Sequence, residues 1–161
     1  MGKLLLSIDP GTTESAYTVV DEKTYQIIAH DKVDNESVIR LVKQGYYDDI
    51  TIEGITSYGQ PIGQETLDTI FLSGRLFQIA LDGENRADII PRKDVKKYYD
   101  VPRKVNADSY IRRTLINRFA TFDKKNGKGT KAKKDWFYGI KADRWQAYAL
   151  AVFWIDTHKE K

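Results

Sequence analysis

The first half of the chain begins with short apolar runs separated by polar breaks. Residues 3–9, 15–20 and 24–30 are predicted strands, because each is a short apolar stretch between turn-forming or charged residues. Pro10-Gly11-Thr12-Thr13 joins the first two, and three charged residues precede the third. We therefore expect three consecutive antiparallel strands.

Helical and strand patterns alternate over the rest of the chain. Asn35 is a candidate N-cap for a helix over about 36–44, whose end is marked by Gly45. The remaining predicted elements are strands at 49–53 and 87–91, helices at 64–82, 92–99, 105–119 and 141–158, and a lysine-rich loop at 120–135. This order predicts an α/β protein with a mixed five-stranded sheet and helices on both faces, which resembles the ribonuclease H-like fold.

Composition limits the available chemistry. The 161 residues suggest one domain spanning 1–161, and the absence of cysteine excludes disulfides, thiolate metal sites and cysteine nucleophiles. With only two histidines, catalysis would depend on carboxylates, hydroxyls or lysines, and a metal would be a hard cation with oxygen ligands. No run reaches the ~18 apolar residues of a membrane span, and charge follows the start too soon for a signal peptide. We expect no membrane association and a cytoplasmic location.

Charge is distributed unevenly along the chain. Residues 1–90 hold 7 Lys and Arg against 15 Asp and Glu, a net −8, whereas residues 91–161 hold 19 against 8, a net +11. A basic half of this kind favours a polyanion such as nucleic acid as the partner. Lysine-rich faces that only contact solvent are the alternative.

Three acids stand at the ends of predicted elements. Asp9 ends the first strand on the side opposite the apolar residues Leu4, Leu6 and Ile8, and Glu53 ends the fourth strand in the same way. Asp143 begins the last helix, on one stripe with Gln146, Ala147 and Leu150. Each acid alone is compatible with a cap or a solvated position, but their repetition favours a shared site.

These acidic segments carry a resemblance to a known family. IDPGTT at 8–13, TIEG at 51–54 and KADRWQAYALAVFW at 141–154 resemble the three acidic motifs of RuvC-type Holliday-junction resolvases, with phage-encoded members as the closer comparison. The resemblance implies that Asp9, Glu53 and Asp143 hold divalent metal ions, Mg²⁺ or Mn²⁺, that hydrolyse a DNA phosphodiester. Two Mg²⁺ roughly 4 Å apart would relieve the repulsion between the acids, activate water and stabilise the leaving oxygen.

One position departs from the family pattern. The last helix of the family usually carries a second acid three residues after the first, where this chain has Gln146. The amide oxygen of Gln146 can still bind a hard cation, but more weakly than a carboxylate does. Asp135 would compensate if the lysine-rich loop folded back toward the site.

Basic and aromatic residues are candidates for DNA contact. The resemblance implies roles beside the active site for Lys96 and Lys104, and Tyr58 is placed either to stack on an unpaired base or to pack on the sheet edge. The loop at 121–134 is expected to be mobile and to contact phosphates without sequence preference, unless its lysines are only solvated. The remaining candidates are Arg92, Lys93, Lys97, Arg112, Lys124, Lys125, Lys128, Lys131, Lys133 and Lys134.

The helix predicted at 64–82 has apolar residues on more than one side. One set is Leu67, Ile70, Phe71, Gly74 and Leu81, and a second set is Leu72, Leu76 and Ile79. This pattern favours a second partner beyond the sheet, most simply another copy in a homodimer, with Leu72 and Leu76 as test positions. Trp136, Phe137, Tyr138, Trp145 and Trp154 are expected to pack in the core.

The sequence thus favours a metal-dependent, structure-selective endonuclease that resolves Holliday junctions and other branched DNA by paired cuts, as a homodimer. A branched-DNA-binding protein without catalysis and a nuclease acting on RNA-containing duplexes remain alternatives. An actin-like kinase or ATPase would need roughly twice this length. We therefore expect no nucleotide cofactor.

Overall fold

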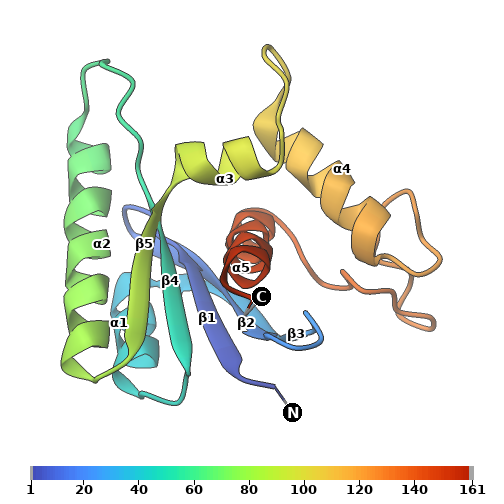
Figure 1. Ribbon diagram of the computed structural model, residues 1–161, viewed down its shortest axis with the longest axis horizontal. Coiled ribbons are helices and arrows are strands. Elements are labelled where there is room, and N and C mark those ends of the chain that lie inside the picture. Colours follow the sequence, from blue (N-terminus) through green and yellow to red (C-terminus); the bar gives the residue numbers. More distant parts are fainter. Residues whose placement is uncertain (1, 160–161) are drawn as a thin grey trace.

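The sheet is the frame on which the rest of the chain is arranged (Figure 1). The computed structural model describes residues 2–159. In chain order, the elements are β1 (Leu4–Asp9), β2 (Glu14–Asp21), β3 (Ile27–Asp34), α1 (Asn35–Lys43), β4 (Asp49–Gly54), α2 (Gln64–Asp82), β5 (Arg86–Pro91), α3 (Arg92–Tyr98), α4 (Ala107–Phe119) and α5 (Arg144–His158). The mixed sheet of five strands and the flanking helices agree with the predicted α/β fold class.

Strand order places β1 at the centre of the sheet. The order is β3-β2-β1-β4-β5, with β1 antiparallel to β2 and parallel to β4. The third strand begins and ends later than predicted, at 27–34 rather than 24–30, and it pairs along its length with β2. The parallel pair β1 and β4 therefore ends at the same edge of the sheet.

Each face of the sheet is covered by a separate apolar layer. Leu6, Ile8 and Ile52 contribute to the layer beneath α1 and α2, whereas Leu5 and Val20 belong to the layer with α3, α4 and α5. Figure 1 shows α1 and α2 on one side of the sheet and α5 on the other, with α3 and α4 beyond it. Because side chains alternate along a strand, Ser7 and Asp9 of β1 share the face covered by α5.

Helix α5 lies close against the centre of the sheet. Its alanines at 147, 149 and 151 are fully buried, and the Ser7 hydroxyl donates a hydrogen bond to the carbonyl of Ala147 at 2.6 Å. On the other side of α5, the Tyr99 hydroxyl donates to the carbonyl of Ala149 at 2.7 Å. Small side chains permit this close approach, so the start of α5 is brought to the sheet edge where β1 and β4 end.

The aromatic core predictions hold in part. Phe137, Trp145 and Trp154 are buried, and the rings of Phe137 and Trp145 lie 4.6 Å apart. Trp136 is half-buried, and its indole N–H donates to the Tyr148 hydroxyl. Tyr138 is exposed, so its assignment to the core was wrong.

The predicted N-cap of α1 is corrected by the hydrogen bonds around this helix. Asp34, rather than Asn35, caps α1, because its carboxylate accepts from the backbone N–H of Ser37. The Asn35 amide instead donates to the carbonyls of Gly11 and Thr12, both at 3.0 Å. Asn35 therefore holds the turn that follows Asp9.

The two apolar faces of α2 have exchanged the roles that the sequence predicted for them. Leu72 and Leu76 are buried against the sheet, so they cannot be surface positions for a second copy. The exposed stripe is the other predicted set, including Leu67, Ile70, Leu81 and above all Phe71, which is 65% exposed.

Among the described residues, no helix is both long and apolar enough to cross a membrane.

Candidate active site

Asp9 and Glu53 lie side by side at the ends of neighbouring parallel strands. Ile8 of β1 is paired with Ile52 of β4, so the next residue of each strand is an acid on the face that α5 covers. Glu53 is buried and Asp9 half-buried. The predicted juxtaposition of these two acids agrees with the strand register.

The turn after Asp9 is held tightly. A Cβ atom on Gly11 would come within 2.3 Å of the carbonyl oxygen of Glu14, so no larger residue fits there without a shift. The Ser15 hydroxyl accepts from the Gly11 N–H and donates to the Asn35 side chain at 2.7 Å. This network fixes the position at which Asp9 leaves the sheet.

The proximity of the two acids changes how they titrate. Burial raises the pKa of Asp9 well above its ordinary value, and Glu53 and Asp143 raise it further by repulsion of the charged form. Burial also raises the pKa of Glu53, although the neighbouring Arg92 opposes this. The pair therefore favours either a proton or a cation between its oxygens.

Arg92 enters this cluster instead of pointing to solvent. Its Nη1 donates to Oε1 of Glu53 at 3.2 Å and to Oε1 of Gln146 at 2.8 Å, and its Nη2 donates to Asp108. Arg92 was predicted as a DNA contact, but its guanidinium has three partners from β4, α5 and α4. The only sequence signal for this contact with the acids is that Arg92 directly follows β5, the strand paired with β4.

Asp143 lies at the cluster but is held to one side. It occupies the N-cap position of α5 without capping it, and Nζ of Lys32 lies 2.7 Å from its Oδ2. The hydrogen bond to Asp143 raises the pKa of Lys32. Lys32 was not predicted, although it lies opposite Ala16 of β2, and Ala16 is itself paired with Asp9.

Only part of the predicted set of oxygen ligands fits a hard divalent cation. Within residues 2–159, no group of three or more acids, histidines or cysteines is drawn together as a metal centre. The Asp9–Glu53 pair nevertheless fits such an ion, because both carboxyls are desolvated and mutually repelling and oxygen is the ligand that Mg²⁺ prefers. The third and fourth predicted ligands, Asp143 and Gln146, instead contact the protein's own cations, Lys32 and Arg92.

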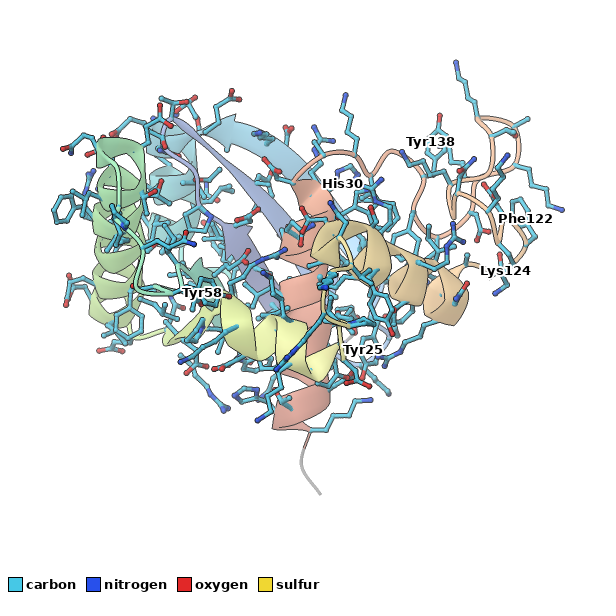
Figure 2. The ribbon with its side chains drawn as sticks, turned by 90° about the horizontal axis from the view of Figure 1, so that it is seen from above. Tyr25, His30, Tyr58, Phe122, Lys124 and Tyr138 are labelled. Atoms are coloured by element: carbon cyan, nitrogen blue, oxygen red, sulfur yellow. The ribbon has the colours of Figure 1, made fainter. Side chains whose placement is uncertain are left out.

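A cavity of about 240 Å³ opens over the two acids. It is lined by Asp9, Glu53, Arg92, Tyr58 and Lys96, among others. Nζ of Lys96 lies 5.8 Å from the centre of the Tyr58 ring, which is 64% exposed, so Tyr58 does not pack on the sheet edge (Figure 2). The structure therefore brings Lys96 and Tyr58 to the acids, as predicted.

The other lysines of this region lie further out. Lys93 and Lys97 are exposed on α3, and Lys97 faces a separate hollow shared with Lys96. Lys104 is exposed in the turn between α3 and α4, with a left-handed backbone φ of 62°, and is not among the residues that line the cavity. The expected place of Lys104 beside the acids is not seen.

The lysine-rich loop is built on two aspartates. The carboxylate of Asp135 accepts from the backbone N–H groups of Thr121, Phe122, Asp123 and Trp136. Although burial opposes the shift, these bonds hold the pKa of Asp135 well below its ordinary value. Asp135 therefore anchors the loop through polar contacts and does not compensate for Gln146. The expected mobility of the loop stays a prediction.

Asp123 organises the inner part of the same loop. It accepts from the N–H groups of Asn126, Lys128 and Gly129. These hydrogen bonds lower the pKa of Asp123. The loop thus has a defined path from which its lysines project.

The loop lysines are not equivalent. The exposed Lys124 donates a hydrogen bond from its ammonium to the carbonyl of Ala120, which argues against the predicted DNA contact but does not test it. Lys133 lies over the Phe122 ring and Lys134 over the Tyr138 ring, while Lys131 is exposed. Figure 2 shows Phe122 and Lys124 at the end of the molecule opposite Tyr58.

A second hollow of about 380 Å³ joins the loop to α4 and α5. It is lined by Arg112 and Arg113 of α4, by Trp145 of α5, and by the loop residues Lys125, Asn126, Lys128 and Gly129, among others. The Arg112 guanidinium lies 5.2 Å from the centre of the Trp145 ring, whereas Arg113 is bonded to the carbonyls of Lys124 and Lys125. Arg112, Lys125 and Lys128 thus form one basic surface away from the acids.

The order of the strands and the helices on both faces of the sheet agree with the ribonuclease H-like fold expected from the sequence. A search of solved structures finds RuvC of Thermus thermophilus in complex with a Holliday junction substrate at 13% identity and a TM-score of 0.62, covering 97% of this chain and 96% of that one. A second Thermus thermophilus RuvC structure matches at 11% identity and a TM-score of 0.61, covering 92% and 91%. The chain therefore has a RuvC-like fold.

Sequence comparisons add nothing to this likeness. No protein-family model matches the chain, and a search of curated proteins finds no match. The resemblance to phage-encoded members stays a prediction.

We predict that Asp9→Asn raises the melting temperature of the metal-free protein. A carboxyl whose pKa is raised by folding binds a proton more readily in the folded state, so stability falls as pH rises from about 4, its unfolded pKa, to the folded pKa. The wild-type melting temperature should thus fall between pH 5 and pH 8 relative to that of Asp9→Asn, by about 2–4 °C per kcal/mol of repulsion. Calorimetry in EDTA measures this.

Glu36→Gln is the matched control, since Glu36 is exposed on α1 and does not belong to the acidic cluster. It should not raise the melting temperature. An Asp9→Asn protein that melts at or below the wild-type temperature at pH 8 would show that the acids do not repel one another.

Proposed function

We propose that this protein is a metal-dependent, structure-selective DNA endonuclease that resolves four-way junctions and other branched DNA. The observation that carries the proposal is the pair of desolvated acids on adjacent parallel strands of a RuvC-like fold. One solved structure with this fold holds a Holliday junction substrate, which supports branched DNA as the partner.

Four residues that line the cavity have distinct roles in the proposed reaction. Asp9 and Glu53 would hold a divalent ion, Mg²⁺ or Mn²⁺, with Asp143 nearby. When bound, such an ion supplies an activated water and stabilises negative charge on the phosphate. Lys96 binds a phosphate oxygen at the cavity, and Tyr58 stacks on a base that branching leaves unpaired. Water is the nucleophile, so no serine or histidine is needed.

The basic surface holds the rest of the substrate. Arg112, Lys125 and Lys128 surround one hollow, and Lys131, Lys133 and Lys134 project from the adjoining loop. Contacts to phosphates position DNA without reading its sequence. Lys93 and Lys97 are exposed on α3 and Lys104 is exposed in the turn that follows it, and we include the three among the proposed phosphate contacts.

A branched-DNA-binding protein without catalysis is the second candidate. It is favoured by one observation, the contact of Arg92 with both Glu53 and Gln146, which places a protein cation where the family pattern has an acid. Cleavage experiments separate it from the endonuclease.

The direct test is incubation with Mg²⁺ and labelled four-way junction, linear duplex, RNA–DNA hybrid or ATP. We expect cleavage of the junction, loss of that cleavage in Asp9→Asn and Glu53→Gln, and junction affinity within about tenfold of wild type, because the acids hold the metal and not phosphates. Glu36→Gln, exposed on α1, is the matched control. Junction binding without cleavage would support the second candidate, and preferential cutting of the hybrid or hydrolysis of ATP would refute both.

We also propose a homodimer formed through the exposed stripe of α2. Phe71→Lys should convert a dimer into a monomer in sedimentation, because it places a charge in the apolar contact. Tyr46→Lys, a matched change at a 78% exposed aromatic elsewhere, should stay dimeric. The monomer should nick junctions without paired cuts. A wild-type protein that sediments as a monomer at micromolar concentration contradicts the dimer.

The loop prediction concerns salt dependence. Each phosphate contact changes the slope of log K against log salt by about 0.9 in B-DNA. Replacing Lys125, Lys128, Lys131, Lys133 and Lys134 by Ser should flatten the slope by several units for junctions of any sequence. Lys124→Ser is the control and should have little effect, since its ammonium is bound to Ala120. If the slope is unchanged when all five lysines are replaced, these lysines contact solvent and not phosphates.

A further inference from the structure

Two cations of the protein itself lie inside the acidic cluster. Lys32 is paired with Asp143, and the side chain of Arg92, only 22% exposed, bridges Glu53 and Gln146. The two contacts differ in character. The Lys32–Asp143 pair is open to solvent, whereas Arg92 is held from three elements at once.

The hold on Arg92 makes it a fixed charge. A guanidinium stays protonated at every relevant pH and offers only donors, so it cannot share a metal ion's ligands as another carboxylate would. Its hydrogen bonds occupy Oε1 of Glu53 and Oε1 of Gln146, so a cation of the protein already engages one oxygen of each of these residues. The carboxylate of Asp108 accepts a hydrogen bond from Nη2, the other terminal nitrogen of the guanidinium.

Gln146 suits this arrangement better than an acid does. Its amide oxygen accepts the Arg92 hydrogen bond without adding a further negative charge beside Asp9, Glu53 and Asp108. A neutral partner also adds no third carboxylate to the two, Glu53 and Asp108, that the guanidinium already contacts where Arg92 lines the cavity with Lys96. The glutamine and the arginine are therefore one unit and not two independent substitutions.

We propose that Arg92, held by Glu53, Gln146 and Asp108, replaces one metal ion of the cluster, so that each chain binds a single divalent cation on Asp9 and Glu53. This inference rests on the proposed function, since it concerns the same site. Arg92 is then a built-in positive charge that a phosphate entering the cavity meets beside the metal.

The experiment counts bound Mn²⁺ in the absence of DNA, by electron paramagnetic resonance combined with equilibrium dialysis. The wild-type chain should bind one Mn²⁺, and Asp9→Asn should bind none. Gln146→Asp alone should still bind one, because Arg92 would pair with the new carboxylate. The double variant Arg92→Gln with Gln146→Asp should bind two ions with a spin-coupled spectrum.

The single variant Arg92→Gln tests the charge itself. Removing a cation beside the ion should tighten Mn²⁺ binding by roughly tenfold. Arg40→Gln, which removes an equal charge on the exposed face of α1, should change it little. Arg92→Lys retains a charge and guards against loss of folding; it should still bind a single ion.

The outcomes separate this inference from the proposed function. Two Mn²⁺ per wild-type chain, or a double variant that still binds one, would overturn the role of Arg92 even if junctions are cleaved. One Mn²⁺ per chain without cleavage would uphold it and refute the endonuclease. A wild-type chain that binds no Mn²⁺ overturns both.

Discussion

Electrostatic repulsion between two carboxyls in a water-poor site is the constraint on which the rest of the structure depends. Parallel pairing of β1 with β4 forces Asp9 and Glu53 to the same edge and face. The close packing of α5 against Ser7 removes water from that face and brings Asp143 and Gln146 to it. Such a pair is costly unless protons or cations lie between the oxygens, so a site of this kind is built to bind positive charge.

The protein supplies part of that charge itself. Lys32 pairs with Asp143 on one side of the cluster, and Arg92 pairs with Glu53 on the other. The Asp9–Glu53 pair is therefore where binding of a cation from solution would relieve the most repulsion. A divalent ion there would face a cavity that Lys96 and Tyr58 also line, with the basic surface of α4 and the lysine-rich loop further away. The proposed metal-binding acids and the basic surface line different hollows, so a substitution in one of them leaves the residues of the other in place.

The sequence predicts the elements and the acid pair well because these depend on local periodicity. Alternation along β1 and β4 places Asp9 and Glu53 on one face, and the motif turns mark where the strands end. The partners Arg92 and Lys32 depend on contacts across the sheet and between helices, which no local pattern encodes. Helix α2 misled the prediction because its apolar residues surround it, so Leu76 and Phe71 could not be ranked before the sheet was in place. The anchors of the lysine-rich loop could not be predicted for a related reason, since they are carboxylates that accept backbone hydrogen bonds and not apolar side chains.

We propose that Asp9 and Glu53 hold a divalent cation beside a fixed guanidinium. Anomalous diffraction from a crystal of the wild-type protein soaked in Mn²⁺ tests this most directly, because it locates the ion without requiring catalysis. We expect one anomalous peak within bonding distance of both carboxylates, with Arg92 still bonded to Gln146. Two peaks with Arg92 displaced, or no peak at these acids while Mn²⁺ binds elsewhere, would contradict it.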